Sequence, residues 1–304
     1  MSSPRVPDSG APHRAGTAAI VGRPNVGKST LLNRLVGARI SIISSRPQTT
    51  RQRITGIVTR PGAQVLFVDT PGYQTQHDSV LNRAMNRTVA ASLREVDAIV
   101  WVVEALRFDD RDEVVARLLP PESTVILAIN KSDRVKDKAR LLPYIADLSA
   151  RRRFEALVPL SAAKGTQVEA LLDAIVALMP EGPRMHDEDE ITTVNERLLA
   201  AELLREKLFQ QLGEELPYAA AVEIGGFKEE RGLRRIQATI LVEKEGQKAI
   251  VIGARGAKLK SIATQARRDM ERLFGGKVFL EVWVKVRRGW AESEGTLKRM
   301  GLAE

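Results

Sequence analysis

The segment GRPNVGKS, residues 22–29, has the residue types and the spacing of a phosphate-binding loop. Gly22 and Gly27 let the backbone fold tightly and turn its N–H groups inward. Lys28 supplies a positive charge for the terminal phosphates, and Ser29 offers a hydroxyl to Mg²⁺ at a helix N-terminus. A ligand-free glycine turn is the alternative, but a strand expected before the loop and a helix expected after it favour a nucleotide. The expected phosphate contacts are Gly22, Arg23, Pro24, Asn25, Val26, Gly27, Lys28, Ser29 and Thr30.

The base is indicated by NKSD, residues 130–133, at the end of an expected strand. There Asp133 can accept paired hydrogen bonds from guanine N1–H and its exocyclic amine, whereas adenine has no such donor pair. The nucleotide is therefore expected to be GTP or GDP. The small residues of SAAKG, residues 161–165, would let backbone N–H groups approach guanine O6, although an ordinary turn explains that segment equally well. The expected base contacts are Asn130, Lys131, Ser132, Asp133, Ser161, Ala162 and Ala163.

Between these motifs lies DTPG, residues 69–72. Asp69 is placed to hold Mg²⁺ through water, and the Gly72 N–H can reach a γ-phosphate because no Cβ blocks it. The polar loop RPQTTR, residues 46–51, offers a second Mg²⁺ ligand, for which we expect Thr50, with Thr49 as the alternative. The expected catalytic residues are Lys28, Thr50 and Gly72, and the expected metal ligands are Ser29, Thr50 and, through water, Asp69. Thr70, Pro71 and Tyr73 complete the expected nucleotide contacts.

A second candidate site is the GARG sequence at residues 253–256, between two predicted helices. Of the formal net charge of +9, +8 falls in residues 225–304, which indicates a polyanionic partner. Glycines in such a loop let a sugar-phosphate chain approach the backbone, so single-stranded RNA is the expected ligand, with a simple helix break as the alternative. The expected RNA contacts are Gly253, Ala254, Arg255, Gly256, Lys258 and Lys260. Base stacking is expected to be minor, because the aromatics Phe227, Phe274, Phe279, Trp283 and Trp290 mostly occupy periodic apolar positions typical of a core.

The elements that position these motifs alternate along residues 17–180. Apolar runs at 18–21, 64–68, 98–103, 125–129 and 156–160 read as buried strands, and helical patterns separate them. This alternation predicts an α/β domain with a mostly parallel sheet covered on both faces. Residues 192–290 show a different pattern from residues 17–180. A long amphipathic helix is expected over 192–212, followed by strand, strand, helix, loop, helix and strand. This order predicts a smaller α+β domain. The remaining parts are an expected flexible tail at 1–16, a linker at 181–191, and a tail or short helix at 291–304.

Composition excludes several classes of protein. The 304 residues include no cysteine and three scattered histidines, which excludes a disulfide scaffold, a thiolate metal site and a serine–histidine triad. The longest apolar stretches are far shorter than the roughly 18 residues of a membrane helix. The expected location is the cytoplasm.

The five nucleotide motifs, in this order, resemble those of translation-factor-class GTPases. Together with ELPYAAAVEI at 215–224 and the GARG loop, they resemble the Era family of P-loop GTPases with a C-terminal type II KH domain, over about residues 17–290. The resemblance implies a monomeric GTPase in small-subunit ribosome maturation. Its expected cofactors are GTP or GDP with Mg²⁺, and its expected partners are the 3′ end of 16S rRNA, the 30S subunit and, in part, the inner face of the membrane.

One residue departs from the Ras-like pattern. Tyr73 stands after Gly72, where a water-orienting glutamine would be. We therefore expect intrinsic hydrolysis on the order of 10⁻³ s⁻¹ or below unless a partner or K⁺ completes the site, although Tyr73 is equally compatible with a surface role. Two other functions stay open: an RNA-binding scaffold with structural GTP, and a peripheral membrane GTPase.

Overall fold

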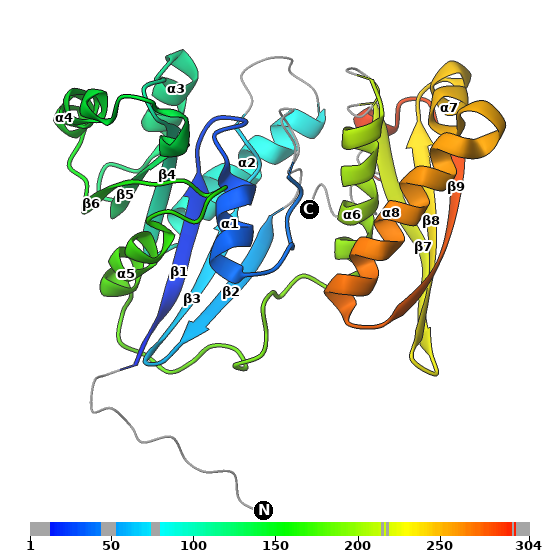
Figure 1. The fold of residues 1–304 in the computed structure, drawn as a ribbon, viewed down its shortest axis with the longest axis horizontal. Helices are drawn as coiled ribbons and strands as arrows, with labels where there is room; N and C mark the ends of the chain where they lie inside the picture. Colours follow the sequence, from blue (N-terminus) through cyan, green and yellow to red (C-terminus); the bar gives the residue numbers. More distant parts are fainter. Residues whose placement is uncertain are drawn as a thin grey trace, which may run out of the picture.

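The structure is a computed structural model and describes residues 13–43, 53–73, 80–213, 216, 219–293 and 295. Its first domain is a six-stranded sheet of order β2-β3-β1-β4-β5-β6, in which only the β2–β3 pair is antiparallel (Figure 1). The elements of this domain are β1 (Arg14–Val21), α1 (Lys28–Val36), β2 (Ile54–Arg60), β3 (Ala63–Asp69), α2 (Val80–Arg94), β4 (Ala98–Glu104), α3 (Asp110–Leu118), β5 (Val125–Asn130), η1 (Ser132–Arg134), η2 (Lys138–Arg140), α4 (Leu141–Arg151), β6 (Ala156–Pro159) and α5 (Val168–Leu178).

Helices cover both faces of this sheet, which confirms the predicted α/β fold. Helices α1 and α5 pack on one face and helices α2, α3 and α4 on the other. The central strands β4 and β5 are buried along almost their whole length, as expected for parallel strands between two helical layers. Strand β1 begins at Arg14, four residues before the strand expected at 18–21, because Arg14 already pairs with Ala63 of β3. Residues 14–16 therefore belong to the sheet and not to a tail.

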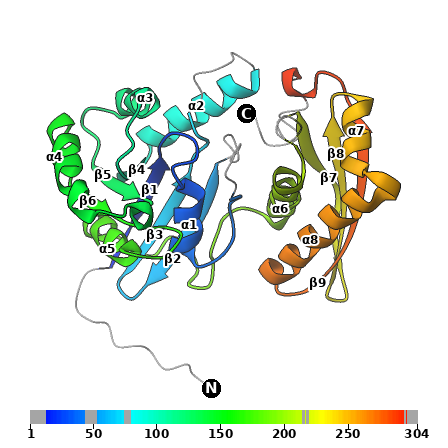
Figure 2. The same cartoon turned by 45° about the horizontal axis from the view of Figure 1, so that its top comes forward.

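The second domain is a three-stranded sheet of order β7-β8-β9 with helices on one face (Figure 2). Strands β7 and β8 are antiparallel, whereas β8 and β9 are parallel. This helix, strand, strand, helix, loop, helix, strand order confirms the predicted α+β domain. Its elements are α6 (Glu196–Gln211), β7 (Ala220–Glu230), β8 (Leu233–Val242), α7 (Glu245–Ile252), η3 (Ala254–Gly256), α8 (Ala257–Phe274), β9 (Lys277–Val286) and η4 (Trp290–Glu292).

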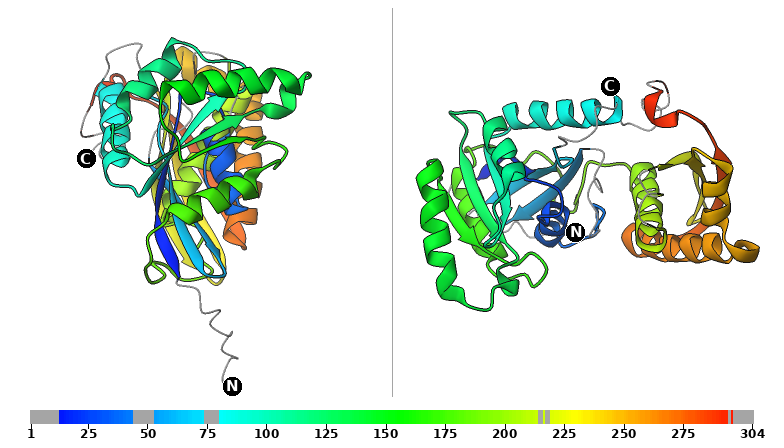
Figure 3. Two further views of the ribbon diagram at one scale, coloured as in Figure 1. Left: turned by 90° about the vertical axis from the view of Figure 1, so that its left-hand side faces the viewer. Right: turned by 90° about the horizontal axis from the view of Figure 1, so that it is seen from above.

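Helix α6 differs from the amphipathic helix expected over residues 192–212. It starts at Glu196 because Asn195 caps it, the Asn195 side chain accepting a hydrogen bond from the N–H of Leu198. It is buried on most of its circumference, since it lies between the first domain and the β7-β8-β9 sheet (Figures 1 and 3). Its charged residues are therefore paired: Arg205 and Glu202 lie 2.8 Å apart, and Lys207 lies 2.5 Å from Asp269 of α8. A helix in such a position has no fully polar face.

The linker follows the first domain's edge instead of crossing solvent. The side chain of Gln64 accepts from the N–H groups of Met185 and His186 and donates to the carbonyl of His186. Further along, the N–H of Ile57 in β2 donates to the carbonyl of Ile191. Within the described residues no helix is both long and apolar enough to cross a bilayer.

Candidate GTP site and RNA-binding loop

The phosphate-binding loop is closed by groups that leave no room for side chains at its glycines. Gly27 has a φ of 104°, and a Cβ there would lie 2.3 Å from Nδ2 of Asn130. A Cβ on Gly22 would lie 2.4 Å from the carbonyl oxygen of Val102 in β4. Both positions therefore require glycine, which explains the motif in steric terms.

Lys28 is buried inside the loop. Its Nζ donates to the carbonyls of Gly22 at 2.9 Å and Arg23 at 3.0 Å. Burial lowers the pKa of Lys28 from 10.5 to about 8, a fall that the nearby Asp69 carboxylate partly opposes. An ammonium held against two carbonyls in a dehydrated loop is positioned to donate hydrogen bonds to phosphate oxygens.

The expected Mg²⁺ ligands Ser29 and Asp69 are adjacent. The hydroxyl of Ser29 donates to Oδ2 of Asp69 at 2.8 Å, and the buried Ser41 donates to the same oxygen at 2.8 Å. A hydroxyl and a carboxylate at this spacing fit a hard cation held directly by the one and through water by the other. Thr50 and its alternative Thr49 lie outside the described residues.

The DTPG segment packs directly on the phosphate-binding loop. A Cβ on Gly72 would lie 3.1 Å from Cγ of Pro24, and Thr70 donates to the carbonyl of Ile20 at 3.0 Å. Tyr73 is half-buried and packs against the apolar cluster beneath α2 and α3. The small Gly72 thus allows the segment to approach the site for the γ-phosphate.

Asn130 connects the three loops around the expected base. Its Nδ2 donates to the carbonyl of Val26 at 2.8 Å, while its Oδ1 accepts from the N–H groups of Lys131 and Ala162. Asn130 therefore holds the phosphate-binding loop, NKSD and SAAKG in one rigid arrangement, a role that residue type alone did not indicate.

Asp133 is exposed at the same edge of the sheet and available to a base. A hydrogen bond from Ser161 holds the pKa of the Asp133 carboxyl below its ordinary value, so the group is ionised at neutral pH. Arg34 of α1 fixes the neighbouring loop by donating to the carbonyls of Ala162 and Ala163. The remaining predicted contacts at this edge, Ser132 and Ala163, lie in the same two loops.

Arg23 is in the loop but has other partners than expected. It is 3% exposed, and its Nε donates to Asp112 at the start of α3 at 2.8 Å. Glu104, at the end of β4, accepts from both Arg23 and Lys131. The side chain of Arg23 thus fastens the phosphate-binding loop to NKSD through one carboxylate. The sequence separation of these pairs, 81 residues for Arg23 and Glu104, gave no signal for them.

The predicted GxxG loop stands between α7 and α8. Gly253 has a φ of 72°, and a Cβ there would lie 2.5 Å from Cβ of Lys258. Arg255 has a φ of 51° and, like Ala254, Lys258 and Lys260, is exposed. The loop therefore offers an open backbone flanked by cations at the N-terminus of an 18-residue helix.

Two aromatics of the second domain correct the sequence prediction. Most of the five aromatics were expected in the core, but Phe279 and Trp283 are 44% and 45% exposed on β9. Trp290 is buried, and Phe227 and Phe274 pack edge to face. The alternating strand KVFLEVWVKV has apolar residues on both faces, so periodicity could not decide which face is buried.

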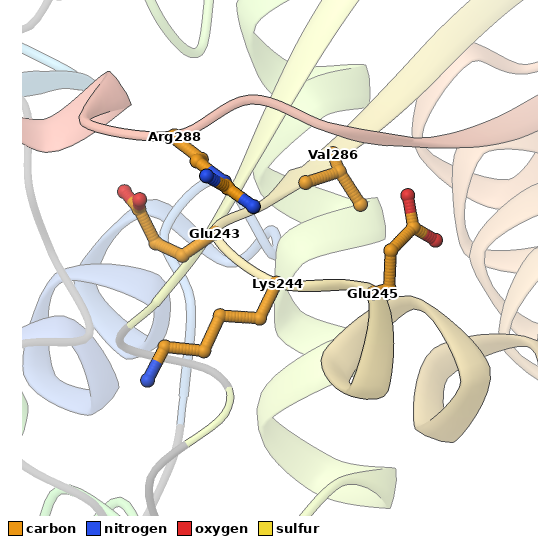
Figure 4. A pocket seen from close by; sticks show the side chains of 5 residues that line it. All are labelled: Glu243, Lys244, Glu245, Val286 and Arg288. Carbon is orange, nitrogen blue, oxygen red and sulfur yellow. The ribbon is translucent and has the colours of Figure 1, made fainter.

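A separate hollow of about 710 Å³ lies at the carboxyl ends of β8 and β9 (Figure 4). It is lined by Glu243, Lys244, Glu245, Val286 and Arg288. The two acidic and two basic side chains cancel, so its charge gives no reason to place a phosphate there.

Comparison with known proteins identifies the family to which this arrangement of loops and domains belongs. The 50S ribosome-binding GTPase family matches residues 17–131, and the KH domain family matches residues 215–291. GTPase Era of Xanthomonas oryzae pv. oryzae is 54% identical over 292 residues, which cover 96% of this chain and 98% of that protein. The chain belongs to the Era GTPase family. It is therefore a GTPase with a C-terminal KH domain.

Other Era proteins support the same assignment. GTPase Era of Stenotrophomonas maltophilia is 53% identical over 291 residues, with 95% of this chain and 98% of that protein covered. Two solved Era structures superpose with a TM-score of 0.92 at 38% identity, covering 96% of this chain and all of theirs. One is Aquifex aeolicus Era Y63A bound to GDP·AlF₄⁻, and the other is Era in complex with MgGDPNP and nucleotides 1506–1542 of 16S ribosomal RNA.

Proposed function

We propose that this Era-family chain is a GTP-driven switch that binds the 3′ end of 16S rRNA and acts in maturation of the small ribosomal subunit. The observation that carries the proposal is the exposed, cationic GxxG loop on a domain joined to one that brings the phosphate-binding loop, DTPG, NKSD and SAAKG together. An Era protein of 38% identity, superposable over both domains, has been solved with MgGDPNP and that RNA segment.

In this proposal Mg²⁺ is held by Ser29, by Thr50 and, through water, by Asp69. When bound, the ion neutralises charge on the β- and γ-phosphate oxygens. Lys28 binds the same phosphates, and the N–H of Gly72 contacts the γ-phosphate. Because Lys28 already meets two loop carbonyls, phosphate oxygens would replace those carbonyls as its partners.

Hydrolysis by this chain alone is expected to be slow, on the order of 10⁻³ s⁻¹ or below. The phenol of Tyr73 cannot orient a water as a glutamine amide does, and its ring packs on the apolar cluster beneath α2 and α3. We therefore assign Tyr73 a packing role and leave completion of the site to a partner or to K⁺. Unchanged single-turnover hydrolysis in Tyr73→Ala would support this assignment.

Residue contacts connect the nucleotide site to the KH domain. Arg39 stands two residues before Ser41, the second donor to Asp69, and forms ion pairs with Glu206 of α6 and Asp269 of α8. A shift of Asp69 on metal binding would thus move Ser41 and, through the chain, the Arg39 ion pairs at the domain interface. This is the route by which we propose that GTP alters RNA presentation.

The deciding experiment measures filter binding of an RNA of nucleotides 1506–1542, with GDP and with a non-hydrolysable GTP analogue. Ala254→Asp adds a negative charge to the GxxG loop at an exposed position with ordinary backbone geometry, and should reduce affinity at least tenfold. Gly246→Asp is the matched control, because it places the same charge on the exposed side of α7, where a Cβ meets open space.

The alternatives give distinct results. Equal RNA affinity in both nucleotide states would favour an RNA scaffold with structural GTP. Flotation with anionic vesicles in the absence of RNA would favour a peripheral membrane GTPase. No RNA binding by the unmodified chain would refute the proposed function.

A further inference from the structure

The face of the KH sheet opposite its helices presents two exposed aromatic rings on one strand. In β9 the residues Val278, Leu280, Val282, Val284 and Val286 pack toward the helices. The alternate positions point the other way, and among them Phe279 is 44% and Trp283 45% exposed. The other two tryptophans of the chain, Trp101 and Trp290, are buried. Leaving two large rings in water is costly unless a partner covers them.

Positive charge surrounds these rings. The exposed Lys277 and Lys285 lie on either side of the two rings along β9, and the guanidinium of Arg235 in β8 lies 5.3 Å from the centre of the Phe279 ring. Register explains the contact, since Arg235 pairs with Phe279 and Thr239 with Trp283. On β7 Glu223, Lys228 and Glu230 share this face, and the Glu230 carboxylate lies 3.8 Å from Nε of Arg235. On β8 and β9 the rings are thus surrounded by three cations, Arg235, Lys277 and Lys285, and one carboxylate, Glu281.

Polar groups occupy the position between the rings. Glu281 points outward there, and its carboxylate accepts a hydrogen bond of 3.1 Å from the Gln237 side chain. A carboxylate and an amide beside a stacking ring are suited to the amino and carbonyl groups on the edge of a base. Phe279 and Trp283, four residues apart on a strand, are separated by about 13 Å, so each can stack on a different base.

Aromatics on an open sheet face, flanked by cations, are the chemistry by which sheets bind unpaired nucleotides. We infer that the β8–β9 face, defined by Arg235, Gln237, Lys277, Phe279, Glu281, Trp283 and Lys285, is a second subsite for single-stranded RNA. The inference rests on the proposed function and extends it, because a GxxG groove accommodates only about four nucleotides. Strand β9 packs against both α7 and α8, the helices that flank the GxxG loop, so the two surfaces share one strand.

The first test compares RNA affinity in point variants. For the RNA of nucleotides 1506–1542, Trp283→Ala and Phe279→Ala should each weaken binding by about 5- to 100-fold, as loss of one stacked base predicts. Trp283→Phe should retain most of the affinity, because phenylalanine keeps a stacking face. A four-nucleotide oligomer from that segment should bind all these proteins alike. Leu142→Ala removes a 72% exposed apolar side chain from α4 and is the control for surface truncation.

Two further measurements separate stacking from charge. Because Trp283 is the exposed tryptophan, the long RNA should quench tryptophan emission in the unmodified chain and much less in Trp283→Phe. Lys285→Gln should lower the slope of log affinity against log salt by about 0.7, the value for one phosphate of a single strand, whereas Trp283→Ala should leave the slope unchanged.

The outcomes distinguish this subsite from the GxxG loop. If Ala254→Asp abolishes binding of both RNAs while Trp283→Ala and Phe279→Ala bind the long RNA as tightly as the unmodified chain, the subsite is refuted and the proposed function stands. If the unmodified chain binds neither RNA, both are refuted. If sedimentation reveals a dimer that Trp283→Ala dissociates, a second copy of the chain covers the face and the subsite is refuted.

Discussion

The hydroxyl of Ser41 donates a 2.8 Å hydrogen bond to Oδ2 of Asp69, the same oxygen that accepts from Ser29. Ser41 lies past the C-terminal end of α1, and Asn33 holds it there by accepting from its N–H and donating to its carbonyl. When Ser29 turns toward a metal, Ser41 remains to orient the Asp69 carboxylate. The proposed Mg²⁺ site thus has a supporting residue outside every nucleotide motif.

Removal of this support should weaken the metal site. In Ser41→Ala, loss of one hydrogen bond to a charged group, about 1.5–3 kcal/mol, should raise the Mg²⁺ concentration for half-maximal hydrolysis roughly tenfold or more. The measurement is single-turnover hydrolysis against Mg²⁺. Ser149→Ala in α4, where the hydroxyl is exposed, should leave the curve in place. An unshifted curve for Ser41→Ala would show that groups other than Ser41 orient the Asp69 carboxylate.

Nucleotide affinity should depend on pH through Lys28. Its pKa is lowered to about 8 in the ligand-free protein, and phosphate anions favour its charged form, so binding above that pH must take up a proton. GDP affinity should therefore fall as pH rises through 8, by up to about tenfold per unit. Calorimetry at pH 8.5 in two buffers of different ionisation enthalpy would count the proton. Lys28→Met should bind more weakly and without uptake.

The same shift affects the stability of the ligand-free protein with the opposite sign. Between pH 8 and 10.5 the unfolded chain holds a proton on Lys28 that the folded chain has released, so this group adds stability as pH rises. Thermal unfolding should show this, because the melting temperature of the ligand-free chain should rise relative to that of Lys28→Met between pH 8 and 10.5. A melting-temperature difference constant across that window would contradict the shift.

Base selection should change in Asp133→Asn. In the proposed GTP complex the exposed carboxylate accepts from two guanine donors. Loss of two charge-assisted hydrogen bonds, at about 1.5–3 kcal/mol each, should weaken GTP binding at least 100-fold. Xanthosine triphosphate, which has a carbonyl in place of the amine, should bind the variant better than GTP. Competition between the two nucleotides measures both effects. Asp137→Asn, at an exposed residue of the neighbouring loop, is the control.

The domain interface should be weakened by Arg39→Ala. Glu206 and Asp269 are buried, and loss of Arg39 leaves Glu206 without its ion-pair partner from the first domain. Since the Arg39 side chain is 39% exposed, we expect a loss of only about 1–2 kcal/mol in unfolding free energy. Chemical denaturation should then resolve two transitions, one for each domain, in place of one.

The loss of unfolding free energy in Arg39→Ala should depend on pH. Burial raises the pKa of Glu206, which means that the folded state binds its proton more tightly than the unfolded chain does. Stability from this group is present below the unfolded pKa and falls as pH rises through the folded value, more steeply once Arg39 is gone. Arg39→Ala should accordingly cost more at pH 7 than at pH 4.5.

Local patterns predicted the parts of the molecule that local chemistry determines. The helix expected after the phosphate-binding loop is present as Lys28–Val36 and ends before Gly37, which has a φ of 75°. Asp69, Gly72 and Asp133 were proposed because each lies at the end of a buried strand or within three residues of it. Long-range contacts were not predictable in this way. The burial of α6 depends on a second domain, and the partners of Arg23 come from β4 and α3.

The docked linker limits how the two domains can move. Its last hydrogen bond to the first domain, among the described residues, runs from the Thr192 hydroxyl to the carbonyl of Thr55, and α6 begins at Glu196. Only residues 193–195 remain between that anchor and the helix, and three residues span at most about 10 Å. With the linker in place, the KH domain can tilt or rotate about this short pivot but cannot travel away. Wider separation requires residues 185–192 to detach from the sheet edge first, so the reach of the RNA-binding surface is set by hydrogen bonds to Gln64, Ile57 and Thr55.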